Sequence, residues 1–215
     1  KIQVQSDGGL IVAIISNATT IADAGAFSVS LGAMTLIKTL TASSSANLTF
    51  VHGSSSVVLD STYPIYKFEF INIHPATNGA DLKVGFRDGG TDYDATKTTT
   101  YFSAYHNEAG NDSGLAYDTG EDLAQSTGFQ NICKSIGNGN DENGSGELFL
   151  FNPSSTTFVK HFMSNALAYE ANDYILNVRV GGYCNVTAAI DGVQFSMNTG
   201  NIDSGTIKLY GIKDS

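Results

Sequence analysis

The chain has 215 residues, of which 15% are charged, and its formal net charge is −10. A chain this acidic repels phosphate backbones, which argues against nucleic acid as a partner. The low charge content, with 23 Gly and only 3 Pro, favours strands and turns over long solvent-exposed helices. Its longest apolar runs fall far short of the ~18 residues of a membrane span, so no membrane span is expected.

Residues 1–33 differ in character from the rest of the chain. The apolar run LIVAII at 10–15 is followed by a stretch rich in Gly, Ala and Ser without a sustained period. We expect an N-terminal arm here that anchors the protein or packs against sister subunits. An ordinary first strand of the main domain is the alternative. Residues 34–215 are expected to form the main domain.

From residue 35 onward, short β-like runs alternate with turn clusters rich in Gly, Asn and Asp. The runs at 35–41 and 47–51 flank a Ser-rich turn and predict a hairpin. The run YKFEFINIH at 66–74 alternates well, and its phase slips near Phe70 and Ile71. That slip predicts a bulge, or a strand covered on both faces.

Seven further runs bring the expected total to nine or ten strands: 81–88, 98–106, 147–153, 157–169, 173–183, 188–197 and 205–213. The stretch TGEDLAQSTGFQNICKSIG at 119–137 predicts one or two helical turns, because Thr119 can cap and Asp122 follows three residues later. Many short strands without strand–helix alternation are typical of a β-sandwich or barrel. We therefore predict an all-β protein, a two-sheet β-sandwich of jelly-roll type with an N-terminal arm.

Two acidic segments raise the question of a metal site. DENGSG at 141–146 begins like a calcium loop, but Asn152 stands where an EF-hand needs a bidentate Glu. Weak calcium ligation by Asp141, Asn143 and Glu147 is the alternative to a solvated turn. The segment DGGTDYD poses the same choice with three carboxylates, Asp88, Asp92 and Asp94.

We assign no metal or cofactor site and predict that 137–146 is an exposed connection. Its glycines would adopt positive φ and lead into a strand at 147–152 that is covered on both faces. The two cysteines, Cys133 and Cys184, form no CxxC motif. Two buried thiols are expected, with a single disulfide as the alternative.

No catalytic residue is assigned, and the protein is predicted not to be an enzyme. GxSxG is absent from the sequence, and the four histidines form no HxH or HExxH pair: His52, His74, His106 and His161. Four glutamates offer carboxylates for glycoside cleavage, but their spacing does not indicate that any two meet: Glu69, Glu108, Glu142 and Glu147. Three tyrosines are candidates for stacking on a sugar, with core packing as the alternative: Tyr101, Tyr105 and Tyr117.

Four segments stand out in this order: YKFEFINIHPATNGADLKVGF at 66–86, FSAYHNEAGNDSGLAYDTGEDLAQSTGFQ at 102–130, GNGNDENGSGELFLFNPSSTTFVKHF at 137–162 and GNIDSGTIKLYGIK at 200–213. Together they resemble a family of small virion proteins, structural or fibre-like, from tailed phages of marine bacteria. The resemblance covers roughly residues 35–213 and matches less well before them.

The resemblance implies a non-enzymatic structural protein on the surface of a bacteriophage particle, such as a tail fibre, a knob or a capsid decoration. Its expected partners are other virion proteins and sister subunits in a homo-oligomer, with adhesion to a host surface glycan as a further role. A carbohydrate-binding module of a host-recognition device is the alternative.

Overall fold

The computed structural model describes the backbone of 2–7, 10–16, 19–23, 26–27 and 33–213, and the side chains of 33–213. The chain divides into two compact units, Lys1–Thr35 and Leu36–Asp214, and each is described by itself. Among the residues described, none is helical. The prediction of an all-β protein is confirmed.

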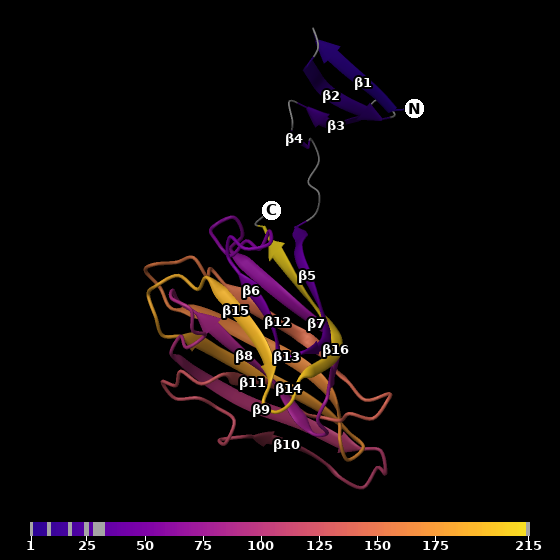
Figure 1. Ribbon diagram of the computed structural model, residues 1–215, viewed down its shortest axis with the longest axis vertical. Helices are drawn as coiled ribbons and strands as arrows, with labels where there is room; N and C mark the ends of the chain where they lie inside the picture. The colour runs from indigo at the N-terminus through magenta and orange to yellow at the C-terminus, as the bar shows by residue number, and fades with distance from the viewer. Residues whose placement is uncertain (1, 8–9, 17–18, 24–25, 28–32, 214–215) are drawn as a thin grey trace. The chain divides into compact units, whose positions relative to one another are not determined.

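The first unit is a four-stranded antiparallel sheet in which the strands follow chain order (Figure 1). Its strands are β1 (Ile2–Asp7), β2 (Leu10–Ser16), β3 (Thr19–Asp23) and β4 (Ala26–Phe27). The expected arm extended over 1–33, and its residues 1, 8–9, 17–18, 24–25 and 28–32 lie outside the described residues. Its role as an anchor or oligomerisation segment stays a prediction.

The second unit contains twelve strands in one nearly closed antiparallel sheet. They are β5 (Met34–Ser45), β6 (Asn47–Val51), β7 (Ile65–Pro75), β8 (Ala80–Arg87), β9 (Lys97–Asn107), β10 (Ser113–Tyr117), β11 (Gln130–Ile136), β12 (Gly144–Phe151), β13 (Lys160–Glu170), β14 (Tyr174–Cys184), β15 (Gly192–Met197) and β16 (Ile202–Ile212). The main order is β5-β16-β7-β12-β13-β11-β8-β15-β6, and β14, β9 and β10 continue from the other edge of β13.

Strand β13 joins the two parts of the sheet. One of its edges pairs with β14 along the whole length of the strand. Its other edge pairs with β12 as far as Ala168, and then with β11 through Glu170 and Ile136. The strands therefore form one curled sheet where two separate sheets were expected.

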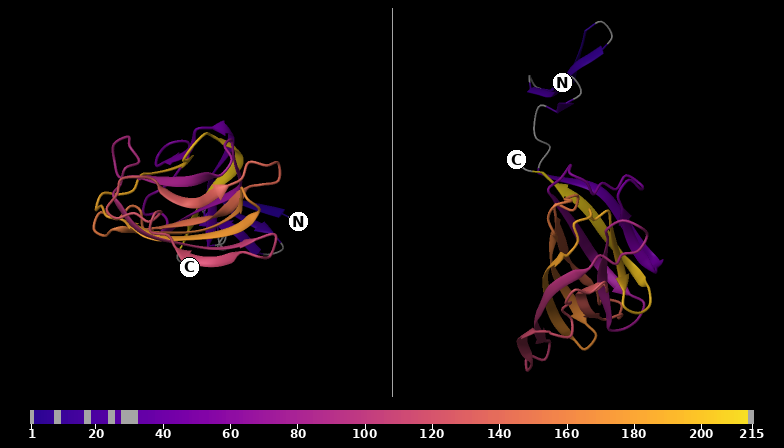
Figure 2. Two further views of the ribbon diagram at one scale, coloured as in Figure 1. Left: turned by 90° about the horizontal axis from the view of Figure 1, so that it is seen from below. Right: turned by 90° about the vertical axis from the view of Figure 1, so that its left-hand side faces the viewer.

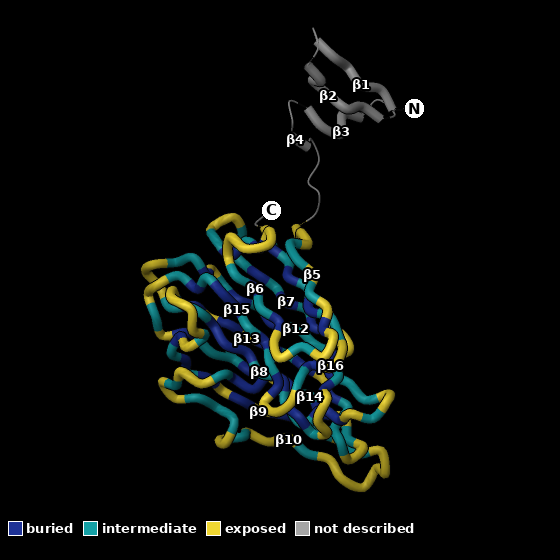
Figure 3. The backbone as a smooth tube through the Cα atoms, in the orientation of Figure 1, coloured by how far each residue is buried: buried dark blue, intermediate teal, exposed yellow. Residues whose placement is uncertain are grey.

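The curled sheet faces itself across a single apolar core (Figures 2 and 3). Phe86 of β8 packs on Phe162 of β13 with ring centroids 4.8 Å apart. Phe68 of β7 packs on Phe195 of β15 at 5.4 Å. Alternating residues of these strands point inward, as the period of two requires, and each fully buried large side chain contributes about 1.5–3 kcal/mol. Burial of these side chains accounts for the fold of the unit.

The bulge predicted in the run 66–74 is confirmed. Phe70 is buried and Ile71 is exposed, and the register between β7 and β12 shifts at this point. Asn72 takes a φ of 52°, in the left-handed region where Asn is tolerated. The opposite strand β16 also shifts register here, and at Gly205 a Cβ would meet the backbone of Asn72.

Two local predictions were wrong. The runs at 35–41 and 47–51 do not form a hairpin, because β5 pairs with β16 and β6 pairs with β15. The stretch at 119–137 is not helical, since its backbone bonds to β9, as between Lys97 and Ser126, and its last third forms β11. Pairing with distant strands outweighed a weak helical pattern interrupted by Gly128.

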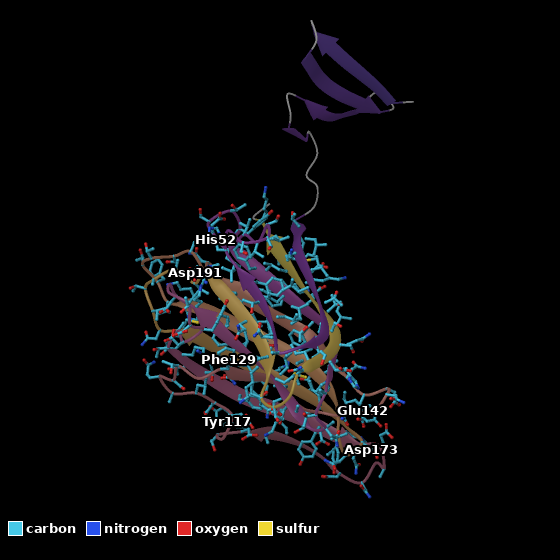
Figure 4. The ribbon with its side chains drawn as sticks, in the orientation of Figure 1. His52, Tyr117, Phe129, Glu142, Asp173 and Asp191 are labelled. Carbon is cyan, nitrogen blue, oxygen red and sulfur yellow. The ribbon has the colours of Figure 1, made fainter. Side chains whose placement is uncertain are left out.

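The second unit has two ends, which we call the first end and the second end, and they carry different loops and turns. At the first end, β5 begins and β16 ends, near the loops that contain His52 and Asp191 (Figures 1 and 4). At the second end lie the β9–β10 and β13–β14 turns, with Asp173 and Glu142 (Figure 4). Strand β5 therefore begins at the end opposite the β13–β14 turn.

Candidate functional site

A cleft of about 320 Å³ opens at the second end, between β9 and β14 on one side and β11 on the other. It is lined by Ser103, Tyr105, Asp112, Lys134, Ser135, Glu170, Asn172, Tyr174 and Leu176. The lining therefore combines two tyrosines with carboxylate, amide and hydroxyl groups. Sites for small ligands combine apolar and aromatic surface with placed polar groups, and in this cleft polar side chains predominate.

The aromatic side of the cleft is formed by Tyr105 of β9 and Tyr174 of β14. Their ring centroids lie 6.0 Å apart in an edge-to-face arrangement. The Tyr105 ring lies against Gly114 of β10, where an added Cβ would come within 2.7 Å of the Tyr105 hydroxyl. The Tyr174 hydroxyl donates to Asp112 Oδ2 at 2.9 Å, and this bond raises the pKa of Tyr174. Both rings are thus held in place without a ligand.

The opposite side of the cleft is formed by two consecutive residues, Lys134 and Ser135 of β11. A regular strand points successive side chains to opposite faces, so this requires an irregularity. The register between β11 and β8 shifts between Cys133 and Ile136, and Ser135 takes a φ of 55°. The Ser135 amide donates to Asp81 Oδ1 at 2.8 Å, which holds the bulge. A non-glycine residue in this region costs about 1–3 kcal/mol, a cost often found at functional sites.

The turn between β13 and β14 closes the cleft at its outer edge. Asn172 donates from its backbone amide to Glu170 Oε2 at 2.8 Å and from its side-chain Nδ2 to Glu170 Oε1 at 3.0 Å. The Tyr169 hydroxyl donates to Glu108 Oε1 at 3.0 Å, which ties the turn to the loop after β9. On the other side of Tyr174 lies a second hollow of about 290 Å³. It is lined by Tyr169 and by Tyr174, which thus lies between the two hollows.

Charge at the cleft is predominantly negative. Among the described residues that line it, Lys134 alone is cationic, and Asp112 and Glu170 are acidic. Lys134 Nζ lies 2.9 Å from Asp118 Oδ2 and 2.9 Å from Glu121 Oε1. The hydrogen bond from Lys134 lowers the pKa of Asp118. The ammonium charge is therefore offset by two carboxylates before any ligand arrives.

A polar layer lies beneath the cleft, in the interior between β9 and β11. Thr99 donates to Gln130 Oε1 at 2.6 Å, and Asn131 Nδ2 donates to Glu121 Oε2 at 3.1 Å. Within the described residues, the Tyr101 hydroxyl and Asn131 Oδ1 are buried without a hydrogen-bond partner. Burial raises the pKa of Tyr101 above its ordinary value. The inward face of β9 thus carries polar side chains along its length, from Lys97 and Thr99 to Ser103 at the cleft.

The structure separates the three tyrosines proposed for sugar stacking. Tyr105 lines the cleft, whereas Tyr101 is fully buried in the core. Tyr117 is 54% exposed on β10, away from the cleft lining, and its hydroxyl donates to Asp122 Oδ2 at 2.6 Å. Sequence reasoning missed Tyr174 and Asn172. The signal for both was the pair of polar residues before a Tyr at the start of a strand, which marks a turn beside an aromatic residue.

The loop at 137–146 is less exposed than predicted, since Asn138, Asn140 and Asp141 are exposed but Gly137 and Gly144 are buried, and its glycines also differ from the prediction. None of Gly137, Gly139, Gly144 and Gly146 is among the positive-φ residues. At Gly137 and Gly139 a Cβ would meet the Glu142 side chain, and at Gly144 and Gly146 it would meet neighbouring strands. These glycines serve close packing, and β12 begins at Gly144, three residues earlier than expected.

The predicted strand is buried on one face and partly covered on the other. Leu148 and Leu150 are fully buried. Phe149 and Phe151 are half-buried on the outer face, where their rings stack with centroids 6.5 Å apart. Lys67 Nζ lies 5.5 Å from the Phe149 ring centroid.

One of the three residues considered as calcium ligands in this loop, Glu147, forms an ion pair instead. Glu147 lies on β12, opposite Glu69 of β7, and Lys67 Nζ is 2.9 Å from a carboxylate oxygen of each. Asp141 is exposed in the loop instead. Two of the four glutamates considered for glycoside cleavage do meet here, but a lysine ammonium separates them. In the part of the chain that the structure describes, no three His, Cys, Asp or Glu side chains are placed to hold a metal ion.

The histidines lie at strand ends and in loops. His74 Nε2 is 3.1 Å from the Gly139 carbonyl oxygen, and His52 Nδ1 accepts from the Leu59 amide at 3.1 Å. His106 and His161 are exposed on strands. In DGGTDYD, Asp92 accepts from Thr91, and Asp94 forms an isolated bridge with Phe86.

Both cysteines are free and buried, as predicted. Burial raises the pKa of Cys133 and of Cys184 to about 12. Cys184 is paired in register with Lys160 on one side and Lys97 on the other, and all three are buried. Burial lowers the pKa of both lysines. The sequence pattern did not indicate two buried lysines.

Comparison with known proteins assigns no relative. No family model, no curated protein and no solved structure matches the chain. The described residues contain no helix that is long and apolar enough to cross a membrane.

Proposed function

We propose that this protein is a non-enzymatic structural component displayed on the surface of a phage particle, as a fibre, a knob or a capsid decoration. The resemblance of residues 35–213 to small virion proteins is one support. The observation that carries the proposal is the difference between the two ends of the second unit. Strand β5 begins at the first end (Figure 1), whereas the cleft is lined by Asn172 and Tyr174, the two neighbours of Asp173 at the second end (Figure 4). This arrangement suits a domain that is held at one end and makes contact at the other.

Contacts with sister subunits or other virion proteins are part of the proposal. Strand β5 is an edge strand that pairs only with β16 in the described sheet. Its residues Met34 and Leu36 are 46% and 52% exposed. Unpaired strand edges with exposed apolar residues favour pairing with another chain. We also propose that the domain is related to jelly-roll sandwiches, because two parts of its curled sheet face each other.

A second candidate function is carbohydrate binding by a host-recognition device. The cleft with Tyr105 and Tyr174 favours it, because tyrosine rings offer an apolar face together with a polar group. The two functions are compatible, since a displayed domain can carry the binding site.

Labelling of purified particles with an antibody against this chain, viewed by negative-stain electron microscopy, tests surface display. We expect label at regular positions on intact particles. Unlabelled particles that nonetheless contain the chain by mass spectrometry would contradict display. Release of reducing ends from host surface polysaccharide by the purified protein would contradict the non-enzymatic assignment.

A further inference from the structure

We propose that the cleft binds an uncharged pyranose unit of a surface glycan and discriminates against acidic sugars, a proposal that rests on the adhesive role described above. The cleft volume of about 320 Å³ is at the lower end of small-ligand sites, which span ~300–1,000 Å³. We therefore assign it one or two sugar units.

The aromatic side provides a surface for the C–H face of a sugar ring. Tyr105 is fixed by Gly114 behind it, and Tyr174 by its hydrogen bond to Asp112. Tyrosine offers a large rigid contact area and loses little side-chain entropy on binding. Because both rings are already held, the ordering cost of binding is small, and this preorganisation favours affinity.

The polar groups around the rings match sugar hydroxyls, which both donate and accept. Each carboxylate has about four acceptor sites, so Asp112 can accept from a ligand hydroxyl while it holds Tyr174. Glu170 can likewise accept while it holds Asn172. The hydroxyl group of Ser135 lines the same cleft and can both donate and accept.

The charges select against an acidic sugar. A uronate or sialate carboxylate in the cleft would face Asp112 and Glu170, and like charges at close range repel. The cation of the lining, Lys134, is already paired with Asp118 and Glu121. The net charge of −10 adds repulsion at longer range. A neutral ring avoids these costs and keeps the hydrogen bonds.

The test is an array of immobilised oligosaccharides, probed with the full chain and containing both neutral and acidic sugars. The neutral set comprises gluco-, galacto-, manno- and N-acetylated pyranosides, and the acidic set comprises uronic and sialic acids of matched length. The best neutral binder is then titrated by calorimetry against its closest uronic analogue. We expect the uronic analogue to bind at least about tenfold more weakly, with the difference shrinking at high salt.

Variants locate the binding at the cleft. Tyr105→Ala removes one ring, Gly114→Ala keeps that ring but displaces it, and Asn172→Ala changes an exposed turn residue. Each is expected to weaken neutral-sugar binding at least about fivefold. The control is Tyr117→Ala, an exposed tyrosine of β10 outside the cleft lining, which should bind as the parent does. Circular dichroism identifies any variant that fails to fold, and the exposed Asn172→Ala keeps the test decisive in that case.

Neutral-sugar binding that falls in the three cleft variants and not in Tyr117→Ala supports the proposal. Preference for acidic sugars, binding that survives all three cleft changes, or no binding across the whole array overturns it. Antibody-labelled particles without sugar binding would remove this inference and leave surface display intact. Sugar binding by a protein whose particles stay unlabelled would support this inference and contradict surface display.

Discussion

Replacing Gly146 with alanine perturbs the closest approach between β12 and its neighbours. A Cβ at this position would meet the carbonyl oxygen of Asn165, and it would lie 2.7 Å from both Ala166 Cα and the Phe70 ring. Asn165 and Ala166 belong to β13, which pairs with β12 in register at this point. Backbone atoms cannot move away without separating the two strands, so the clash cannot be relieved by a side-chain rotation.

Overpacking of a filled core typically costs ~1–3 kcal/mol, and we expect about 2–3 kcal/mol because backbone atoms are involved. For a chain of this size, that is a fall in melting temperature of about 4–12 °C. Gly181→Ala is the matched control, since its Cβ would meet only Thr100 Oγ1 at an ordinary 3.5 Å. Alanine in a strand is favoured over glycine by ~0.5–1 kcal/mol, so the control should be unchanged or slightly stabilised.

Urea unfolding followed by circular dichroism measures both variants against the parent. The reasoning is refuted if Gly146→Ala unfolds within about 0.5 kcal/mol of the parent, or if the two variants are equally destabilised, because β12 would then not be packed as closely as the structure has it.

Two further predictions concern the cysteines and the acidic loop. Cys133 and Cys184 have a pKa of about 12 when folded against an ordinary value of 9.0, so the unfolded state loses these protons first as the pH rises. Between pH 8 and pH 10 the free energy of unfolding should therefore fall by about 2–3 kcal/mol more in the parent than in the double Cys→Ala variant, as measured by urea titrations at the two pH values. Lys97 and Lys160, whose pKa burial lowers, act in the opposite direction but are common to both proteins. Equal changes in both proteins would contradict the assignment. Changing Asp141, Asn143 and Glu147 together to Ala should lower stability by no more than about 1 kcal/mol, the worth of one partly exposed ion pair. Addition of EDTA in a thermal melt should affect neither protein, and a chelator-sensitive parent would show that the loop binds metal.

Local patterns predicted the features that depend on neighbouring residues. The alternation of YKFEFINIH indicated β7, and its phase slip indicated the bulge at Ile71 and Asn72, because side-chain direction in a strand follows directly from residue parity. The turn residues likewise indicated most strand boundaries. The pattern does not specify which strands pair. The hairpin predicted around the Ser-rich turn at 43–45 does not form, because β5 and β6 have different partners.

The candidate site depends almost wholly on such non-local pairing. Lys134 and Ser135 both line the cleft only because β11 changes register against β8, and nothing in NICKSIG indicates that shift. Tyr105 was one of three candidate tyrosines, and Tyr101, another of them, is buried in the core. What distinguishes Tyr105 is Gly114 opposite it, which belongs to β10, a strand that the sequence did not predict. A site assembled from three distant segments is hard to predict, because no single segment contains a sequence pattern that indicates it.

The most direct measurement of the central claim is to locate a bound sugar on the full chain by amide chemical shifts. The protein is labelled with ¹⁵N and titrated with the best neutral oligosaccharide from the array, and two-dimensional spectra are followed to saturation. We predict that the largest shifts fall at the second end, on Tyr105, Ser135, Asn172 and Tyr174, while the loops of His52 and Asp191 at the first end stay unchanged. Saturable shifts centred on the first end, or spectra that do not change at all, would contradict the claim that this protein makes its contact through the cleft.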